Sequence, residues 1–488
     1  MTTEHLLASV KRLLDTAEPV LRQPYASRIP ELRERLHGPL RVAIAGKVKA
    51  GKSTLLNALV GEKVAPTDAG ECTRVVTWYR NSHVYRVTGV PFEGPPVELR
   101  FRRTEGALEI DLDGRAAEEL RYLDVEWPSA SLRDMVLIDT PGLASISDDV
   151  SRRTERFLAS DDEGPGDADA VIYLMRHLHP MDLSFLESFR DTTATAGAAI
   201  NSIAVLSRAD EIGAARTNAL QAAEMVAARY RDDERVGSLC QVVVPVAGLI
   251  GQAAASLRQD EVLELRRLAA IPRAETTEML LSAQRFRDLD SSAGTDPAMR
   301  RQLLDHLGLF GVRLAMELLV ADRVDSASDL AAELERRSGI RELRAILRGQ
   351  FASRAAVLKA RSTLATISAL ADLHGGQEGR TLRDMVRDIE NAAHQLVEIR
   401  LLTQLRRESS GLGHDAAEAE RILGNDGPDP HVRLGLPATA TKKEVWQAAM
   451  DAISDWRTRA EDPLIDNDSR HVARGVIRTC EELAMAGP

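Results

Sequence analysis

Short apolar runs alternate with helical patterns along the first half of the chain. The runs lie at about 40–45, 135–138, 170–174, 203–206 and 242–246, and helical repeats separate most of them. Short strands that alternate with helices are typical of a parallel sheet covered by helices on both faces. The pattern therefore predicts a doubly wound α/β domain with a mostly parallel sheet over residues 37–250.

The second half of the chain has a helical pattern. After Gly251, stretches rich in Ala, Leu, Arg and Glu replace the strand-like runs. Helices are predicted at about 253–288, 299–325, 329–372, 381–408, 443–457 and 469–484. The helix at 381–408 keeps one apolar face from Leu382 to Val397 and would extend about 40 Å if unbroken. A rod of that length must belong to a bundle, so this half is predicted to be an extended all-α structure.

The N-terminal segment also has the pattern of a bundle helix. Apolar side chains between residues 6 and 21 recur every three or four positions, which gives the helix one apolar seam. We expect this seam to pack against C-terminal positions such as Ala452 and Trp456, and ordinary packing in a helical core is the alternative. The predicted regions are an N-terminal helix at 1–36, the α/β domain at 37–250, a helical region at 251–442 and returning helices at 443–488.

Composition argues against several classes of protein. The chain has 63 Lys and Arg, 74 Asp and Glu, a net charge of −11 and only 4% aromatic residues, which does not fit a nucleic-acid binder. The cysteines Cys72, Cys240 and Cys480 are far apart, so a disulfide framework or a zinc site is not expected and the chain fits a reduced, cytoplasmic setting. No apolar run approaches the roughly 18–20 residues of a membrane-spanning helix.

The strongest chemical signal is a glycine-rich loop between a predicted strand and a predicted helix. Residues 46–53 read GKVKAGKS and fit the pattern G-x-x-x-x-G-K-[ST]. Glycines let the backbone fold around phosphate oxygens, and the N-terminus of the next helix adds partial positive charge. Lys52 would reach the β- and γ-phosphates, and the Ser53 hydroxyl would bind Mg²⁺. The predicted nucleotide-binding residues of this loop are Gly46, Ala50, Gly51, Lys52, Ser53 and Thr54. A purely structural glycine turn is the alternative.

A second phosphate-facing element follows the apolar run at 135–138. The tetrapeptide DTPG begins at Asp139 and ends at Gly142. A carboxylate at the end of a buried strand can hold Mg²⁺ through water, and the Gly142 amide could sense the γ-phosphate. The position of this element, about 90 residues after the glycine-rich loop and on its own strand, supports that role.

Two weaker elements complete a guanine-nucleotide set. Thr73 lies about 20 residues beyond Ser53, where its hydroxyl could reach Mg²⁺ and the γ-phosphate. Residues 207–210, Ser-Arg-Ala-Asp, imitate the base-reading motif [NT]-K-x-D, in which the carboxylate of Asp210 would accept both N–H groups of guanine. Such a site can discriminate between bases by about 10⁴ to 10⁵. Ser207 and Arg208 depart from the usual residues, so a P-loop ATPase with a helical arm stays open as an alternative.

Together these elements resemble the nucleotide-binding motifs of large GTPases. The segments AGKSTLLNAL at 50–59 and DTPGLAS at 139–145 are similar to those of bacterial dynamin-like proteins, in particular to their isoniazid-inducible mycobacterial members. The motif likeness covers about residues 40–250, and beyond it only the helical pattern is similar. The resemblance implies an α/β P-loop GTPase domain with an extended all-α neck and trunk.

The resemblance also implies an activity and partners. GTP bound with Mg²⁺ would be hydrolysed to GDP, and faster when two GTPase heads associate across their nucleotides. The trunk would bind an anionic membrane, as a cytoplasmic protein peripheral to the inner face of the cell membrane, and remodel or divide it. The alternative is a cytosolic regulatory GTPase whose helical half grips a protein partner and never touches lipid.

The glycine-rich loop departs from the animal dynamins at two positions. Where those proteins have Gln and Ser, this chain has Val48 and Lys49, so the attacking water must be positioned by another group. Lys49 could offset the negative charge that develops on the phosphate, as an arginine finger does, or it could be an ordinary solvated lysine. Because no other Gln is evident for this task, we expect slow intrinsic turnover.

A membrane-contacting tip needs an apolar wedge beside basic residues. The end of the predicted helix 381–408 offers Arg400, Leu401, Leu402, Leu405, Arg406 and Arg407. Each arginine would contribute about 1 kcal/mol near an anionic surface, and inserted leucines a similar few kcal/mol together. One copy would therefore bind weakly, and several linked copies would be needed. The alternative is that these leucines close a helical bundle.

Overall fold

The computed structural model describes residues 3–65, 75–104, 107–141, 168–189, 201–215, 217–237, 239–289, 294–321, 324, 326–407, 412–485 and 487. Within these residues, ten strands form one mixed sheet in the order β10-β9-β8-β1-β7-β2-β6-β3-β4-β5. The strands are β1 (Leu40–Gly46), β2 (Thr77–Asn81), β3 (Arg86–Pro91), β4 (Val97–Thr104), β5 (Ala107–Asp111), β6 (Leu120–Trp127), β7 (Met135–Asp139), β8 (Ala170–Met175), β9 (Ser202–Ser207) and β10 (Val243–Val246).

The parallel half of the sheet is the core of the molecule. Strands β10, β9, β8, β1 and β7 run parallel, and every residue of β8 and β9 is buried. Successive side chains of a strand point to opposite faces. Accordingly, Val42 and Ile44 enter the apolar cluster on one face, while Ala43 and Ala45 enter the cluster on the other. All five strands coincide with predicted apolar runs, and the predicted α/β fold with a helical second half is confirmed.

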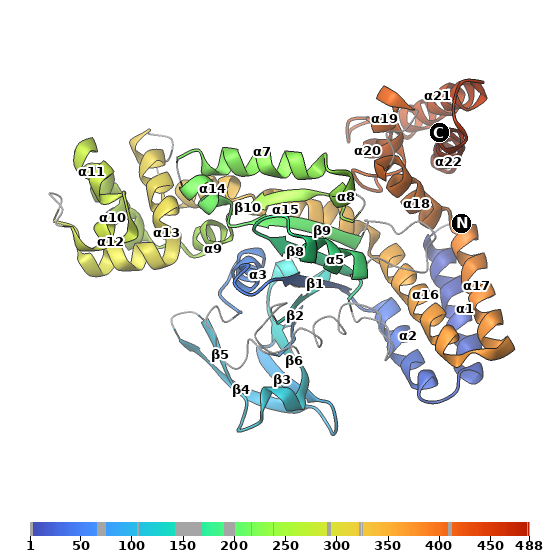
Figure 1. The fold of residues 1–488 in the computed structure, drawn as a ribbon, viewed down its shortest axis with the longest axis horizontal. Coiled ribbons are helices and arrows are strands. Elements are labelled where there is room, and N and C mark those ends of the chain that lie inside the picture. Colours follow the sequence, from blue (N-terminus) through green and yellow to red (C-terminus); the bar gives the residue numbers. More distant parts are fainter. Residues whose placement is uncertain are drawn as a thin grey trace.

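The other half of the sheet was not predicted. Strand β2 pairs antiparallel with β7 and parallel with β6, and β3, β4 and β5 follow in antiparallel order. These strands lie at the lower edge of the molecule in Figure 1. Strand β3 alternates between exposed and buried positions, so its apolar signal is half that of a strand covered on both faces.

The α/β domain, called the head from this point on, includes helices from beyond residue 250. Helix α9 (Gly248–Ser256) packs on α3 (Lys52–Val60), and α14 (Ala327–Arg337) and α15 (Ile340–Ile346) return to α9 and β10. A Cβ atom added to Gly251 would lie only 2.4 Å from Cγ1 of Ile340. Gly339 has a φ of +80°, and a Cβ there would meet the Pro245 carbonyl oxygen at 2.3 Å. These close approaches fix α14 and α15 to the sheet as part of the head.

Apart from the helices that lie on the sheet, the described helices form three groups around the head (Figure 1). One lobe contains α10 (Gln259–Ala269), α11 (Arg273–Met279), α12 (Ala283–Asp288) and α13 (Pro297–Val320). At the other end, a bundle contains α1 (Thr3–Val20), α2 (Ile29–His37), α16 (Ala355–His374) and α17 (Gly376–Ala392). The C-terminal group contains α18 (His394–Arg407), α19 (Ala416–Ile422), α20 (Pro430–Leu434), α21 (Lys442–Glu461) and α22 (Asn467–Ala484).

The apolar seam of α1 packs differently from the prediction. Its buried residues include Leu6, Val10 and Leu14, and the helix packs against α16, α17 and α2. The expected partners Ala452 and Trp456 lie on α21, which packs chiefly against α22. A heptad pattern identifies which face of a helix is buried but does not identify the partner, so the predicted pairing was wrong.

Several predicted long helices are divided in the structure. The segment 253–288 forms four helices, with Pro272 and the N-cap Ser282 at two of the breaks. The segment 329–372 is broken at Gly339 and forms α14, α15 and α16. The helix predicted at 381–408 breaks at Ala393, whose φ of −80° and ψ of 100° are not helical. The next residue, His394, is buried and bonds to Thr479 of α22, so the chain turns to reach the C-terminal group.

A buried carboxylate joins the head to the bundle. Asp169 lies just before β8, and its Oδ1 accepts hydrogen bonds from Nε of Arg35 at 2.7 Å and Oγ of Ser362 at 2.9 Å. Its Oδ2 accepts the backbone N–H of Arg41 at the start of β1, at 2.9 Å. Residues of α2, α16 and β1 therefore meet at the side chain of Asp169. This joint lies at the amino ends of β1 and β8.

No described helix has the length and apolar character that spanning a bilayer would require.

Candidate functional site

The glycine-rich loop lies at the opposite, carboxyl edge of the parallel sheet, between β1 and α3. Gly46 ends β1 with a φ of +149°, and a Cβ atom there would lie 2.5 Å from the Leu174 carbonyl oxygen of β8. Gly51 has a φ of +97° and precedes the first residue of α3. Glycine is required at Gly46 because of both the backbone conformation and the close approach of β8. The loop is thereby held against two neighbouring strands.

Lys52 points back into this loop. The side chain is largely buried, and its Nζ donates to the carbonyl oxygens of Gly46 at 3.1 Å and Lys47 at 3.2 Å. Burial lowers the pKa of Lys52, and the charge of Asp139 opposes that shift. A lysine ammonium has three N–H donors. Two are directed by the loop, which leaves the third for a phosphate oxygen.

Ser53 and Asp139 meet at the base of the loop. The Ser53 hydroxyl donates to Oδ2 of Asp139 at 2.8 Å, so the two predicted metal-binding residues lie side by side. The Oδ1 atom of Asp139 is buried and accepts no hydrogen bond from the described residues. Burial raises the pKa of this carboxyl, while Lys52 and Ser53 act in the opposite direction. A hydroxyl beside a carboxylate with one unused oxygen fits the hard oxygen ligands that Mg²⁺ prefers.

The base-reading motif lies at the end of β9, next to the glycine-rich loop. Arg208 has a φ of +54°, and its guanidinium donates to the Lys49 carbonyl oxygen at 3.0 Å and to Glu211 at 2.7 Å. Burial raises the pKa of Asp210, with Arg208 acting in the opposite direction. Ser207 is buried and donates its hydroxyl to the Met175 carbonyl oxygen. Arg208 therefore ties the motif to the loop, and Asp210 is left with a partly desolvated carboxylate.

One cavity connects the two motifs. Its volume is about 220 Å³. The lining comprises Ala50, Gly51, Thr54, Leu55, Leu174, Val205, Ser207, Arg208, Asp210, Glu211, Val246, Gly248 and Leu249. The cavity thus contains both loop residues predicted to bind phosphate and the residue predicted to bind guanine. It lies at the carboxyl ends of parallel strands, where ligands of α/β sheets usually bind.

Part of this lining was missed by the sequence prediction. Val246 ends β10, and Gly248 and Leu249 begin α9. The available signal was the apolar run at 242–246, because the residues after each parallel strand meet at the same edge of the sheet. No recognisable motif marks Gly248 or Leu249, so only their position after a strand could have identified them.

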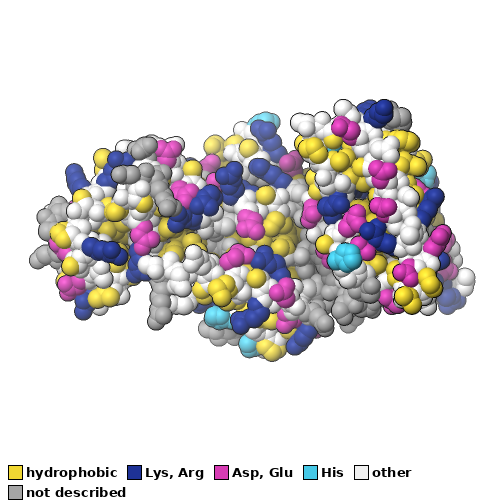
Figure 2. Space-filling view, turned by 90° about the horizontal axis from the view of Figure 1, so that it is seen from above, with side chains coloured by type: hydrophobic (Ala, Val, Ile, Leu, Met, Phe, Trp, Pro, Cys, Tyr) yellow, Lys and Arg dark blue, Asp and Glu magenta, His cyan; other side chains and the backbone are white. Residues whose placement is uncertain are grey.

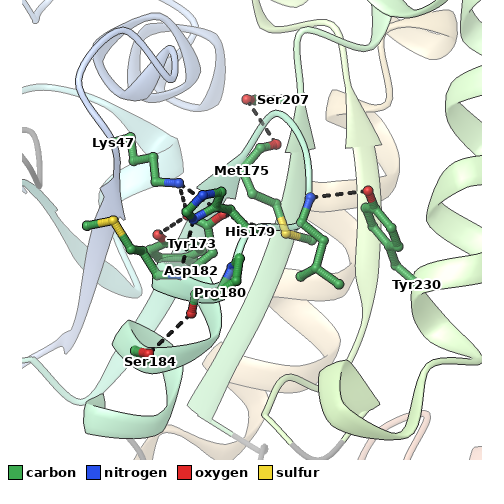
Figure 3. Close-up of polar contacts among 11 residues, drawn as sticks. Lys47, Tyr173, Met175, His179, Pro180, Asp182, Ser184, Ser207 and Tyr230 are labelled. Carbon is green, nitrogen blue, oxygen red and sulfur yellow. Dashed lines mark hydrogen bonds and ion pairs between the residues drawn. The ribbon is translucent and has the colours of Figure 1, made fainter.

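A second missed feature lies beside the glycine-rich loop (Figure 3). Nζ of Lys47 is 3.2 Å from Oδ1 of the buried Asp182, which follows β8 in the first turn of α5 (Pro180–Phe189). The Tyr173 hydroxyl and the His179 backbone N–H also donate to this carboxylate, at 2.7 and 3.0 Å. Asp182 is distant from Lys47 in the sequence, and no motif connects them.

Some predicted residues lie outside the described part of the chain. Thr73 and Gly142 are among them, and so are the side chains of Arg406 and Arg407. The described residue nearest to Thr73 on its N-terminal side is Ala65. Its carbonyl oxygen and N–H both bond to the buried side chain of Asn57 in α3.

The prediction that three leucines of α18 contact a membrane is wrong. Leu401, Leu402 and Leu405 are 2%, 4% and 5% exposed, so they are not available for insertion. Leu401 packs against Gly475 of α22, where an added Cβ would lie 2.0 Å from its Cδ1. Arg400 forms an ion pair with Glu390 at 3.2 Å. The alternative holds instead, in that these leucines close a helical bundle.

Comparisons with known proteins show the family of the chain. The model of the Dynamin family matches residues 42–189. The chain is 39% identical over 457 residues to isoniazid-induced protein IniC of Mycobacterium tuberculosis, which covers 93% of this chain and 92% of that protein. It is 30% identical over 166 residues to a bacterial dynamin-like protein of Nostoc punctiforme, which covers 31% of this chain and 23% of that protein.

A solved structure gives a looser likeness. The match is to a protein of an oligomerised bacterial dynamin pair, which is described as sensing and tethering membranes over long range. It covers 97% of this chain and 90% of that protein, with 13% identity and a TM-score of 0.32. At that TM-score the likeness carries no argument about this chain. The 39% identity to IniC over nearly the whole length confirms the resemblance found in the motifs. The chain belongs to the bacterial dynamin-like proteins, in the family that includes IniC, and is a GTPase.

Proposed function

We propose that the cavity between the glycine-rich loop and Asp210 is the GTP site, and that hydrolysis there drives remodelling of an anionic membrane. The observation that carries the first part is the shared cavity itself. It is lined by Gly51 and Thr54 on the phosphate side and by Ser207 and Asp210 on the base side. A glycine-rich turn with a purely structural role would not require a partly desolvated carboxylate in the lining of the same cavity.

Each residue then has a defined task. The backbone of residues 46–51 and the N-terminus of α3 bind the phosphates, and Lys52 directs one ammonium N–H at them. Ser53 and Asp139 would hold Mg²⁺, together with Thr73, and this ion would neutralise charge on the β- and γ-phosphate oxygens. The Gly142 amide would contact the γ-phosphate. Asp210 accepts the guanine N–H groups, and Arg208 lies over the base.

The attacking water needs a positioning group that the loop does not supply. Val48 is 48% exposed and apolar, so it offers no hydrogen bond to water. Lys49 would offset the negative charge that develops during hydrolysis. Without a water-orienting side chain the intrinsic rate would be low, and association of two heads across their nucleotides would raise it.

Membrane remodelling is proposed because the chain belongs to the bacterial dynamin-like proteins. The chain would act as a cytoplasmic protein peripheral to the inner face of the cell membrane. In Figure 2, basic and acidic side chains are interspersed over the visible face, so attraction to an anionic surface would be local and weak. Useful attachment would therefore need several linked copies.

Co-sedimentation with liposomes tests the membrane part. The full chain is mixed with anionic and with neutral vesicles, with GTP, with GDP and without nucleotide. We expect GTP-dependent sedimentation with anionic vesicles only, weakened by salt. If the protein stays in the supernatant at high concentration with every nucleotide, membrane binding is contradicted and the partner-binding regulatory GTPase is favoured.

A further inference from the structure

Lys47 and Asp182 form an ion pair directly beside the glycine-rich loop. Figure 3 shows the Lys47 side chain reaching from the loop to Asp182, with Tyr173 and His179 around the same carboxylate. Asp182 is 1% exposed, whereas the Lys47 side chain is 37% exposed. Burial and the neighbouring Asp182 raise the pKa of Tyr173, so its hydroxyl stays protonated and donates. Of the described side chains, Lys47 is the cation paired with this carboxylate.

A buried carboxylate is stable only with compensating charge and hydrogen bonds. Tyr173 and His179 supply two neutral donors, and Lys47 supplies the positive charge. Removal of one partner of a buried ion pair leaves the other charge uncompensated. The Lys47 side chain is therefore held toward α5 and away from the cavity.

The same residue also helps to orient Lys52. The Lys52 ammonium is held by two carbonyl oxygens, those of Gly46 and Lys47. Gly46 pairs with Leu174 of β8 and is fixed by the sheet. Lys47 forms a single β-bridge just after β1, and its carbonyl oxygen accepts the Ala50 N–H at 3.1 Å. Its side chain adds a further anchor through the ion pair with Asp182.

We infer that Lys47 is a positioning residue of the GTPase site. The ion pair with Asp182 adds a side-chain anchor to the backbone contacts of Lys47 and so helps to hold its carbonyl oxygen, which in turn directs the third N–H of Lys52 toward the phosphates. The Lys47 side chain itself does not touch the nucleotide. This inference deepens the proposed function and rests on it, since it assigns to Lys47 the preorganisation of a site that binds GTP.

The inference predicts which substitutions weaken nucleotide binding. In the full chain, Lys47→Met should weaken binding of GTP with Mg²⁺ about tenfold, because residue 47 loses its side-chain anchor and its carbonyl oxygen is held less firmly. Lys47→Arg keeps the charge and should bind within about threefold of the wild type. Asp182→Asn should resemble Lys47→Met. The double variant should be no weaker than either single variant, because both substitutions remove the same contact.

The test is equilibrium binding of a fluorescent GTP analogue, with steady-state kcat and KM and a thermal melt for each variant. Lys11→Met, which removes an exposed lysine of α1, is the matched control and should bind like the wild type. Equal affinity of Lys47→Met and wild type would overturn the inference, and so would losses that add in the double variant. If Asp182→Asn fails to fold, the contrast between Lys47→Met and Lys47→Arg still decides, because Lys47 is only partly buried.

The outcomes separate this inference from the proposed function. A wild-type chain that binds no guanine nucleotide would overturn the proposed site as a whole. A wild type that binds GTP, together with Lys47 variants of unchanged affinity, would overturn only the positioning role.

Discussion

The residue with the most direct role in the proposed site is Lys52. Its ammonium is buried and already held by two loop carbonyl oxygens. Lys52→Ala removes the cation that would face the phosphates, so GTP binding or turnover should be lost while the fold is retained. Turnover assays and circular dichroism together check this. Normal GTPase activity in a folded Lys52→Ala chain would refute the assignment of the loop.

Asp210 controls the choice of base in this account. A carboxylate accepts both N–H groups of guanine, whereas an amide at the same position can donate one hydrogen bond. Asp210→Asn should therefore lower affinity for GTP and raise it for xanthosine triphosphate, which carries a carbonyl where guanine carries its amino group. Competition binding with both nucleotides measures the change. An unaltered nucleotide profile would count against Asp210 as the base-reading residue.

The sequence motifs predicted most of the residues that meet at this site, but not the ion pair beside the glycine-rich loop. Lys52, Ser53, Asp139 and Asp210 were predictable because each belongs to a short motif at the end of a strand. The pair of Lys47 and Asp182 was not, because nothing near either residue in the sequence indicates which distant side chain it will contact.

At the scale of elements, the joint between head and bundle depends on Asp169. Its carboxylate binds Arg35 and Ser362, and both Asp169 and Arg35 are buried. Asp169→Ala leaves Arg35 uncompensated and should lower the free energy of unfolding by about 3–5 kcal/mol. Urea denaturation measures this. Asp15→Ala, which breaks an exposed pair with Arg33, is the control and should change stability far less. Similar losses in both variants would show that Asp169 contributes no more to the free energy of unfolding than an exposed ion pair does.

The C-terminal group contains a buried histidine that should make stability depend on pH. Burial lowers the pKa of His394, and the nearby Glu398 opposes the shift. Below the ordinary pKa of 6.5 the unfolded chain takes up a proton that the folded chain does not, so stability falls as pH drops through that range. The Thr479 hydroxyl donates to Glu398 at 2.9 Å, so it accepts the hydrogen bond from Nε2 of His394, also 2.9 Å away.

The comparison that isolates this effect is His394→Gln against the wild type. Between pH 7 and pH 5 the wild type should lose more stability than the variant, because glutamine has no proton to take up. Thermal melts across that range provide the measurement. Parallel pH profiles for the two proteins would contradict the assignment of a neutral, buried His394.

Helices were predictable as elements but not in their pairing. The segments 443–457 and 469–484 match α21 and α22 closely, because their periodic apolar faces end at clear caps. The break at Ala393 was missed because it depends on a long-range contact of His394. Leu401 and its neighbours were expected at a membrane surface because an apolar face beside arginines has the same pattern whether lipid or another helix covers it.

At the scale of the whole molecule, the nucleotide site and the joint lie at opposite ends of β1 and β8. Strands β1 and β8 and the Asp169 joint therefore connect the glycine-rich loop to the bundle. If two heads associate across their nucleotides, GTP turnover per molecule should rise with protein concentration. Turnover measured over a dilution series checks this, and a constant specific rate would contradict head association.

The central claim is that the cavity between the glycine-rich loop and Asp210 binds a guanine nucleotide. Calorimetric titration of the wild-type chain with GTP and with ATP, each with Mg²⁺, tests it most directly. The account predicts saturable binding of one GTP per chain and binding of ATP that is weaker by about 10⁴. No heat of binding with GTP, or equal affinity for ATP, would contradict it.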